Sequence, residues 1–101
     1  MTKDFVSTRS GRITYWDFEG VDPARPLADQ QELLKEDLIQ IEFDNDVIVD
    51  AGWYPSFSPD GHFVVFVVQK GLWLEPLFKE SARDIAGLRT VLDEAVSIAS
   101  Q

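Results

Sequence analysis

The segment Phe63-Val64-Val65-Phe66-Val67-Val68 decides the fold of this chain. Six consecutive apolar residues leave no polar side for water, so both faces of this strand should be covered. Ser58-Pro59-Asp60-Gly61 precedes it as a turn, because proline presets φ and the Asp-Gly pair completes the reversal. Lys70-Gly71 marks a second turn directly after it. The segment should therefore be the most buried strand of an antiparallel sheet joined by short hairpins.

Further strands are expected on both sides of this segment. Residues 38–43 alternate, with Ile39, Ile41 and Phe43 on one face and Gln40 and Glu42 on the other. A turn at 44–46 leads into extended structure over 47–54, where Gly52 is a candidate bulge. Residues 5–8 and 13–18 are rich in aromatic and β-branched side chains. Residues 72–78 give the last strand, which Pro76 confines to an edge or a bulge.

The C-terminal segment has the clearest helical pattern. Ser81 is a suitable N-cap, and Asp84 follows three residues later as its partner. Apolar residues then recur at helical spacing: Ile85, Leu88, Leu92, Ala95 and Ala99. A short helix is also expected over 27–37. The sequence thus predicts one α+β domain over residues 1–101, with an antiparallel sheet of five to six strands packed against the C-terminal helix.

Charge and composition restrict the partners. Nine basic and 18 acidic residues give a net charge of −9, which disfavours nucleic acid and anionic membrane surfaces. A basic protein partner is favoured, although this charge equally suits a protein that only needs to stay soluble. The chain has no cysteine, its first residues lack the apolar core of a signal peptide, and its longest apolar run has six residues. We therefore expect a cytoplasmic protein.

No catalytic pattern stands out. His62 is the one histidine, and no Gly-x-Ser-x-Gly elbow or glycine-rich phosphate loop is present. Asp44, Asp46 and Asp50 do not match a calcium loop, because Val49 and Pro55 occupy its glycine and glutamate positions. We expect a non-enzymatic protein without cofactor or metal. A hydrolase with two carboxylates is the enzymatic alternative, and it predicts two buried, neighbouring acids with shifted pKa values.

Aromatic residues next to acidic ones are the strongest binding signal. Such clusters are typical of interfaces that capture basic partners, in which aromatic side chains contribute affinity and acids steer the encounter. A tryptophan taken alone is more often a core residue. The predicted partner-binding residues are Asp44, Asp46, Asp50 and Asp60 for steering, Trp53, Tyr54 and Trp73 as anchors, and Glu75 beside Trp73.

A resemblance covers residues 38–99. Five features follow one another in this part of the chain. They are the segment Asp50-Ala51-Gly52-Trp53-Tyr54-Pro55, a turn, an apolar strand, the segment Trp73-Leu74-Glu75-Pro76-Leu77 and a closing amphipathic helix. This order resembles small immunity proteins of contact-dependent growth inhibition and related polymorphic toxin systems of bacteria. The resemblance implies a cytoplasmic, non-enzymatic protein that neutralises a cognate toxin, commonly a basic nuclease.

Two other interpretations stay open at this stage. The aromatic residues would instead line a pocket in the sheet if the chain is a small-molecule-binding or accessory domain. A homodimer formed through an exposed sheet edge is also compatible with the sequence.

Overall fold

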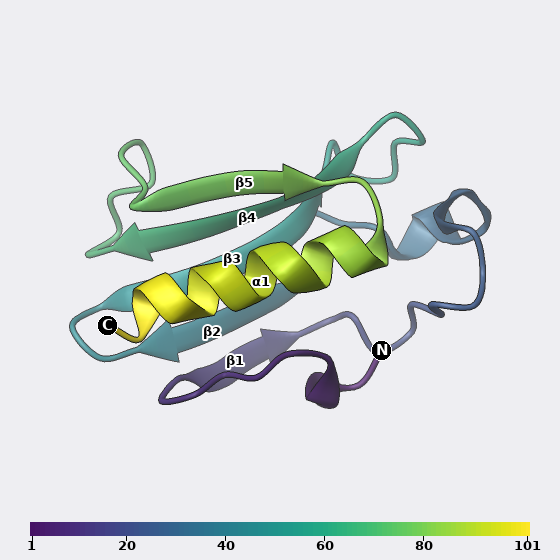
Figure 1. Ribbon diagram of the computed structural model, residues 1–101. Coiled ribbons are helices and arrows are strands. Elements are labelled where there is room, and N and C mark those ends of the chain that lie inside the picture. Colours follow the sequence, from purple (N-terminus) through teal and green to yellow (C-terminus); the bar gives the residue numbers. More distant parts are fainter.

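The computed structural model describes residues 1–101 and consists of one antiparallel sheet and one α-helix (Figure 1). The strands follow the chain in the order β1-β2-β3-β4-β5, so every connection is local. The predicted α+β fold, with a helix packed on a five-stranded antiparallel sheet, is confirmed. The elements are β1 Arg12–Trp16, β2 Ile39–Phe43, β3 Val47–Tyr54, β4 His62–Gln69, β5 Phe78–Ala82 and α1 Ile85–Ala99, with 3₁₀ segments at Lys3–Phe5 and Leu27–Leu33.

Helix α1 covers one face of the sheet because the strand alternation directs apolar side chains there. Ile41 on β2, Val49 on β3 and Val65 on β4 lie on this face and are fully buried. Leu88 and Leu92 are the fully buried leucines on the inner side of α1. Each such side chain contributes about 1.5–3 kcal/mol through removal from water, so this layer contributes strongly to the stability of the fold.

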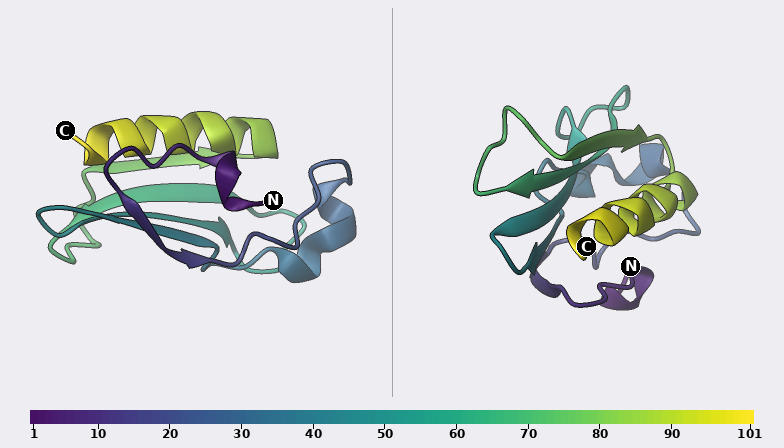
Figure 2. Two further views of the ribbon diagram at one scale, coloured as in Figure 1. Left: turned by 90° about the horizontal axis from the view of Figure 1, so that it is seen from below. Right: turned by 60° about the vertical axis from the view of Figure 1, so that its left-hand side comes forward.

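The opposite face of the sheet has no helix over it, and we call it the open face. Figure 2 shows α1 on one side of the strands and nothing comparable on the other. The loop after β4 curls onto that side, and the segment before β2 crosses it at Gly52. The side chains of the open face come from alternate positions of β2 to β5: Gln40, Glu42, Ile48, Asp50, Tyr54, Val64, Phe66, Val68 and Lys79.

Gly52 lets the segment before β2 cross closely over β3. A Cβ atom at this position would lie 1.7 Å from the carbonyl oxygen of Glu36. Two backbone hydrogen bonds fix the crossing: the N–H of Trp53 donates to Lys35 at 2.7 Å, and that of Leu38 donates to Ala51 at 3.1 Å. The predicted bulge at Gly52 is therefore wrong, because the β3 register is continuous there. The one irregularity of the sheet lies in β1, between Ile13 and Tyr15.

The ends of the chain differ from the prediction in several places. Residues 5–8 form no strand, so the sheet has five strands. Residues 72–77 are a loop, and the last strand is Phe78–Ala82, in which Ser81 pairs with Val64. The helix is capped by Asp84, whose carboxylate accepts a hydrogen bond from Gly87 N at 2.7 Å. The expected helix over 27–37 is a 3₁₀ segment that ends at Leu33.

Candidate protein-binding face

A row of paired residues crosses the open face from one edge of the sheet to the other. Each member is the cross-strand partner of the next, in the order Tyr15, Gln40, Asp50, Phe66 and Lys79. We call it the central row. It places a carboxylate between an amide and an aromatic ring, in the middle of a face that no helix covers. Asp50 is the only buried carboxylate of the chain, so the central row marks the open face as chemically different.

Asp50 is the one carboxylate that the fold buries, since only 4% of the residue is exposed. Its Oδ2 accepts a hydrogen bond of 2.9 Å from the Gln40 side-chain amide. Burial raises the pKa of Asp50 above its ordinary value, the Gln40 hydrogen bond partly offsets this, and the charge of Asp37 adds to the rise. The pair of buried carboxylates that the hydrolase alternative predicts is not found, because Asp37 is exposed.

Tyr54 lies at the end of β3 on the same face and is half-buried. Burial raises the pKa of Tyr54 to about 12, and the charges of Asp50, Glu36 and Asp37 contribute to the rise. These three carboxylates therefore lie near enough to the phenol to act on it. The crossing at Gly52 brings Glu36 and Asp37 to this place. The local field on this part of the open face is negative and suits a cation.

The aromatic residues of the open face form a continuous line. The ring of Phe66 packs edge-to-face against Tyr54 at 6.1 Å and against Trp73 at 6.2 Å between centroids. Lys79 Nζ lies 5.5 Å from the Phe66 centroid. Such tilted pairs are the favoured arrangement of aromatic rings. Trp73 thereby anchors the loop 70–77 to the sheet.

The loop 70–77 exposes an unusual amount of apolar surface. Leu74 is 98% exposed and Trp73 is 46% exposed, and Leu72 and Leu77 are more than half exposed. All four residues belong to one loop of eight residues, so the exposed apolar side chains are clustered and not scattered over the surface. Contiguous exposed apolar side chains of this kind mark interaction sites. Pro76 explains part of the conformation, since it has no N–H to donate to a sheet.

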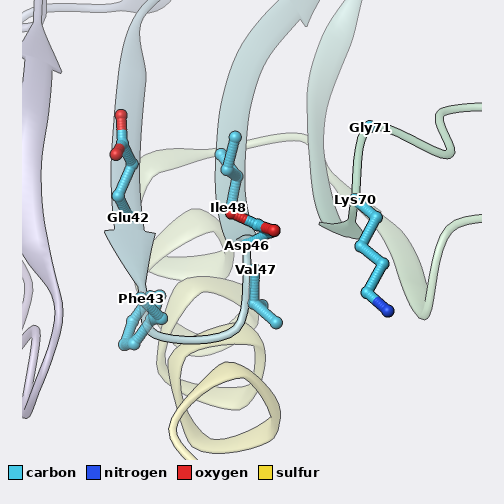
Figure 3. A pocket seen from close by; sticks show the side chains of 7 residues that line it. All are labelled: Glu42, Phe43, Asp46, Val47, Ile48, Lys70 and Gly71. Carbon is cyan, nitrogen blue, oxygen red and sulfur yellow. The ribbon is translucent and has the colours of Figure 1, made fainter.

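The largest surface hollow lies at the end of the β2–β3 hairpin, beside the start of this loop (Figure 3). Its volume is about 610 Å³, and it is lined by Glu42, Phe43, Asp46, Val47, Ile48, Lys70 and Gly71. Phe43 is its only aromatic residue, and that ring belongs to the buried core under α1. The hollow therefore does not provide the aromatic-lined pocket that the small-molecule interpretation requires.

The structure brings together some of the predicted binding residues. Asp50 and Tyr54 lie on the open face, and Trp73 and Glu75 lie in the loop 70–77. The β2–β3 turn with Asp44 and Asp46 lies at the same end of the sheet as that loop, because β2 and β4 both end there.

Three of the predicted binding residues are either buried or lie at the other end of the sheet from the loop 70–77. Trp53 is only 4% exposed; its ring packs on Phe63 at 5.0 Å and its Nε1 donates to Ser58 O. It faces α1 because the alternation along β3 places it opposite Tyr54, so the prediction of an exposed anchor is wrong. Asp60 lies in the β3–β4 loop, at the other end of the sheet from the loop 70–77. Asp50 is too deeply buried to steer a partner from a distance.

Several residues of this face escaped the sequence analysis. The alternation of β2 placed Gln40 and Glu42 on one side, and pairing with the alternating β3 would have brought Gln40 to Asp50. Phe66 lies in a run of six apolar residues. Because both faces of that strand are apolar, the sequence does not show which face Phe66 occupies. Nothing in the sequence indicated that Leu72, Leu74 and Leu77 are exposed, because a strand was the simpler interpretation of that segment.

Other kinds of site leave no trace in the structure. No group of three or more histidine, aspartate or glutamate side chains is close enough to hold a metal ion. None of the helices combines the length and apolar character that crossing a membrane requires. Comparison with protein-family models, curated proteins and solved structures found no match.

Proposed function

We propose that this chain is a non-enzymatic immunity protein that binds a basic toxin through the open face and the loop 70–77, and so neutralises it. One observation carries the proposal: a sheet face without a helix adjoins a loop that exposes Leu72, Trp73, Leu74 and Leu77 among carboxylates. A face of this kind supplies an apolar centre and a charged surround, as protein interfaces do.

The charge distribution supports a basic partner. The structure contains two ion pairs, Lys35 with Asp17 at 2.6 Å and Arg12 with Glu42 at 3.7 Å. Most of the 18 acidic side chains therefore have no cationic partner within the chain. Their field accelerates the approach of a basic protein and favours correct orientation. A nuclease toxin suits this surface, because its substrate-binding cations would meet carboxylates in place of phosphates.

Co-expression with the neighbouring gene tests the proposal. We expect a stoichiometric complex with a protein that stops growth when it is produced alone and that this chain silences. If the neighbouring product is harmless and only the lone chain is recovered, the immunity function is wrong.

A pair of charge reversals shows which face is used. Asp37→Lys with Glu75→Lys changes carboxylates beside the open face, whereas Asp93→Lys with Glu94→Lys makes the same change on the exposed side of α1. The first double variant should slow association with the toxin and weaken its dependence on salt, and the second should act much less. Equal effects from both variants would exclude the open face as the interface.

A further inference from the structure

The part of the open face over β1 and β2 contains a second, smaller hollow. Its volume is about 380 Å³, and it is lined by Thr14, Tyr15, Asp37, Gln40 and Glu42. We call it the acidic hollow. It contains two carboxylates and no basic side chain among its lining residues. Two cations lie nearby in ion pairs. Arg12 reaches Glu42 at 3.7 Å. Lys35 reaches Asp17, to which the Tyr15 hydroxyl also donates at 3.5 Å.

Asp50 adjoins this hollow through Gln40, which lines the hollow and donates to Asp50 Oδ2. No hydrogen bond reaches the other oxygen, Oδ1, from within the chain. No buried side-chain oxygen or nitrogen lacks a partner, so Oδ1 must retain some contact with solvent. A carboxylate that is 4% exposed thus keeps one free acceptor on a face without cover. A hydrogen bond from a charged donor stabilises such a carboxylate much more than it stabilises an exposed one.

The amide of Gln40 adds a second acceptor at the same place. Its nitrogen is engaged by Asp50, and its oxygen has no donor from the chain. The carboxylate of Asp37 lies close enough to act on Asp50, and the Tyr15 ring stands at the edge of the hollow. Several acceptors beside an aromatic ring match a guanidinium group, which presents five N–H donors in a plane and stacks on aromatic faces. An ammonium group presents three donors around a point and matches this arrangement less well.

We propose that the acidic hollow, together with Asp50, which is hydrogen-bonded to its lining residue Gln40, receives one arginine side chain of the protein partner. This inference rests on the proposed function, since it assigns the partner residue that the open face selects. The arginine would donate to Asp50 Oδ1 and to the Gln40 oxygen, and its charge would meet Asp37 and Glu42. An interface usually depends on a few such desolvated anchors surrounded by weaker contacts.

The test uses a short probe in place of the partner. Acetyl-Gly-Arg-Gly-amide is titrated into the labelled full chain, and NMR records the Gln40 side-chain amide and the backbone signals of Asp50 and Phe66. We expect saturable shifts of these signals with the arginine peptide and none with its citrulline analogue, which has the same shape without the charge. Equal shifts with citrulline would overturn the proposal, and a lysine peptide that binds as tightly would overturn the choice of guanidinium.

Matched variants decide whether Asp50 is responsible. Asp50→Asn keeps the shape and can still accept from Gln40, and it should weaken binding of the arginine peptide about tenfold. Asp93→Asn removes the same charge from the exposed side of α1 and should leave peptide binding unchanged. Unchanged binding by Asp50→Asn, or equal loss in both variants, would refute a specific site.

The same variants separate this inference from the proposed function. A toxin complex that forms normally with Asp50→Asn would overturn the arginine site and leave the immunity function intact. Conversely, a peptide that binds at Asp50 in a chain without any toxic neighbour would retain the arginine site and overturn the proposed function.

Discussion

The two faces of the sheet are built from the same strands but differ in what covers them. On one face, Val49, Val65 and Leu92 are fully buried among the apolar side chains of the core. On the other face, the corresponding positions carry Gln40, Asp50 and Phe66, and the loop 70–77 and the segment 35–37 reach across. Under the proposed function, stability and recognition are divided between the faces, because a helix covers one of them and the partner would bind the other.

The largest effect on stability should come from the helix-covered face. Leu92→Ala removes a fully buried side chain between α1 and the sheet and should lower the free energy of unfolding by about 2–5 kcal/mol. Ile48→Ala removes a half-buried side chain from the open face and should cost about 1 kcal/mol. Urea unfolding of both variants measures the difference. Equal costs would show that the two faces stabilise the fold alike.

A second effect comes from the crossing that shapes the open face. Gly52→Ala places a methyl group against the Glu36 carbonyl, so the segment 35–37 must move, at a cost of about 1–3 kcal/mol. Gly20→Ala is the matched control, because its nearest neighbour, the Leu33 side chain, lies 3.6 Å away at ordinary contact distance. Thermal unfolding should show a clear loss for Gly52→Ala and almost none for Gly20→Ala.

The Gly52 variant also reports on charge. If the segment 35–37 shifts, Glu36 and Asp37 move away from Tyr54, and the pKa of Tyr54 should fall below its value of about 12. A pH titration of the phenolate absorbance measures this change. A destabilised variant with an unchanged Tyr54 titration would contradict the role of Gly52 in bringing these carboxylates to the open face.

A third effect, smaller than the first two, concerns the buried carboxylate. Because the pKa of Asp50 is raised in the folded state, that state binds the proton more tightly than the unfolded chain does. The stability contributed by protonated Asp50 is therefore fully present below the ordinary value of 3.8 and is lost as pH rises through the folded-state value. Asp50→Asn should remove this pH dependence and stabilise the protein at neutral pH.

Urea unfolding at several pH values between 3.8 and 7 measures this effect. Asp44→Asn serves as the control, since that carboxylate lies in an exposed turn. If Asp50→Asn destabilises the chain at neutral pH, the ionised carboxylate contributes to folding, and its retention needs no functional reason. If Asp50→Asn stabilises the chain, the ionised Asp50 side chain lowers the stability of the fold. Residues that are retained for recognition often lower stability in this way.

The sequence predicts the helix-covered face well, for a physical reason. Burial under α1 requires apolar side chains at alternate strand positions and at helical spacing, and both periods are visible along the chain. The pairs Ile39 with Ala51 and Val49 with Val67 follow once the short hairpins are recognised. The same logic failed at the end of the sheet, where Ser81 was predicted to be the N-cap but pairs with Val64 in β5.

The open face is harder to predict because its distinguishing features are not periodic. Asp50 was visible as an acid, but its burial depends on Gln40 and on the segment 35–37 that crosses at Gly52. Trp53 was predicted to be an exposed anchor because acidic residues lie near it in the sequence. Its position in the strand alternation places it on the buried face instead. Residues 72–77 have the composition of a strand, and only the structure shows that Phe78 begins the pairing.

The smallest effect on folding, and a large one on binding, is expected at the tip of the loop 70–77. Leu74 is 98% exposed, so Leu74→Ser should change the free energy of unfolding by no more than about 0.5 kcal/mol. Its apolar surface has no use within the chain, and we expect the variant to lose affinity for the toxin because an apolar contact is removed. Calorimetric titration of the complex measures this loss.

Phe57→Ser is the control for that variant, because Phe57 is also more than half exposed but lies in the β3–β4 loop at the other end of the sheet. It should leave toxin binding unchanged. Loss of binding in both variants would mean that exposed apolar surface acts without regard to its place. Loss with Leu74→Ser alone, at unchanged stability, would separate the face that holds the fold together from the face that meets the partner.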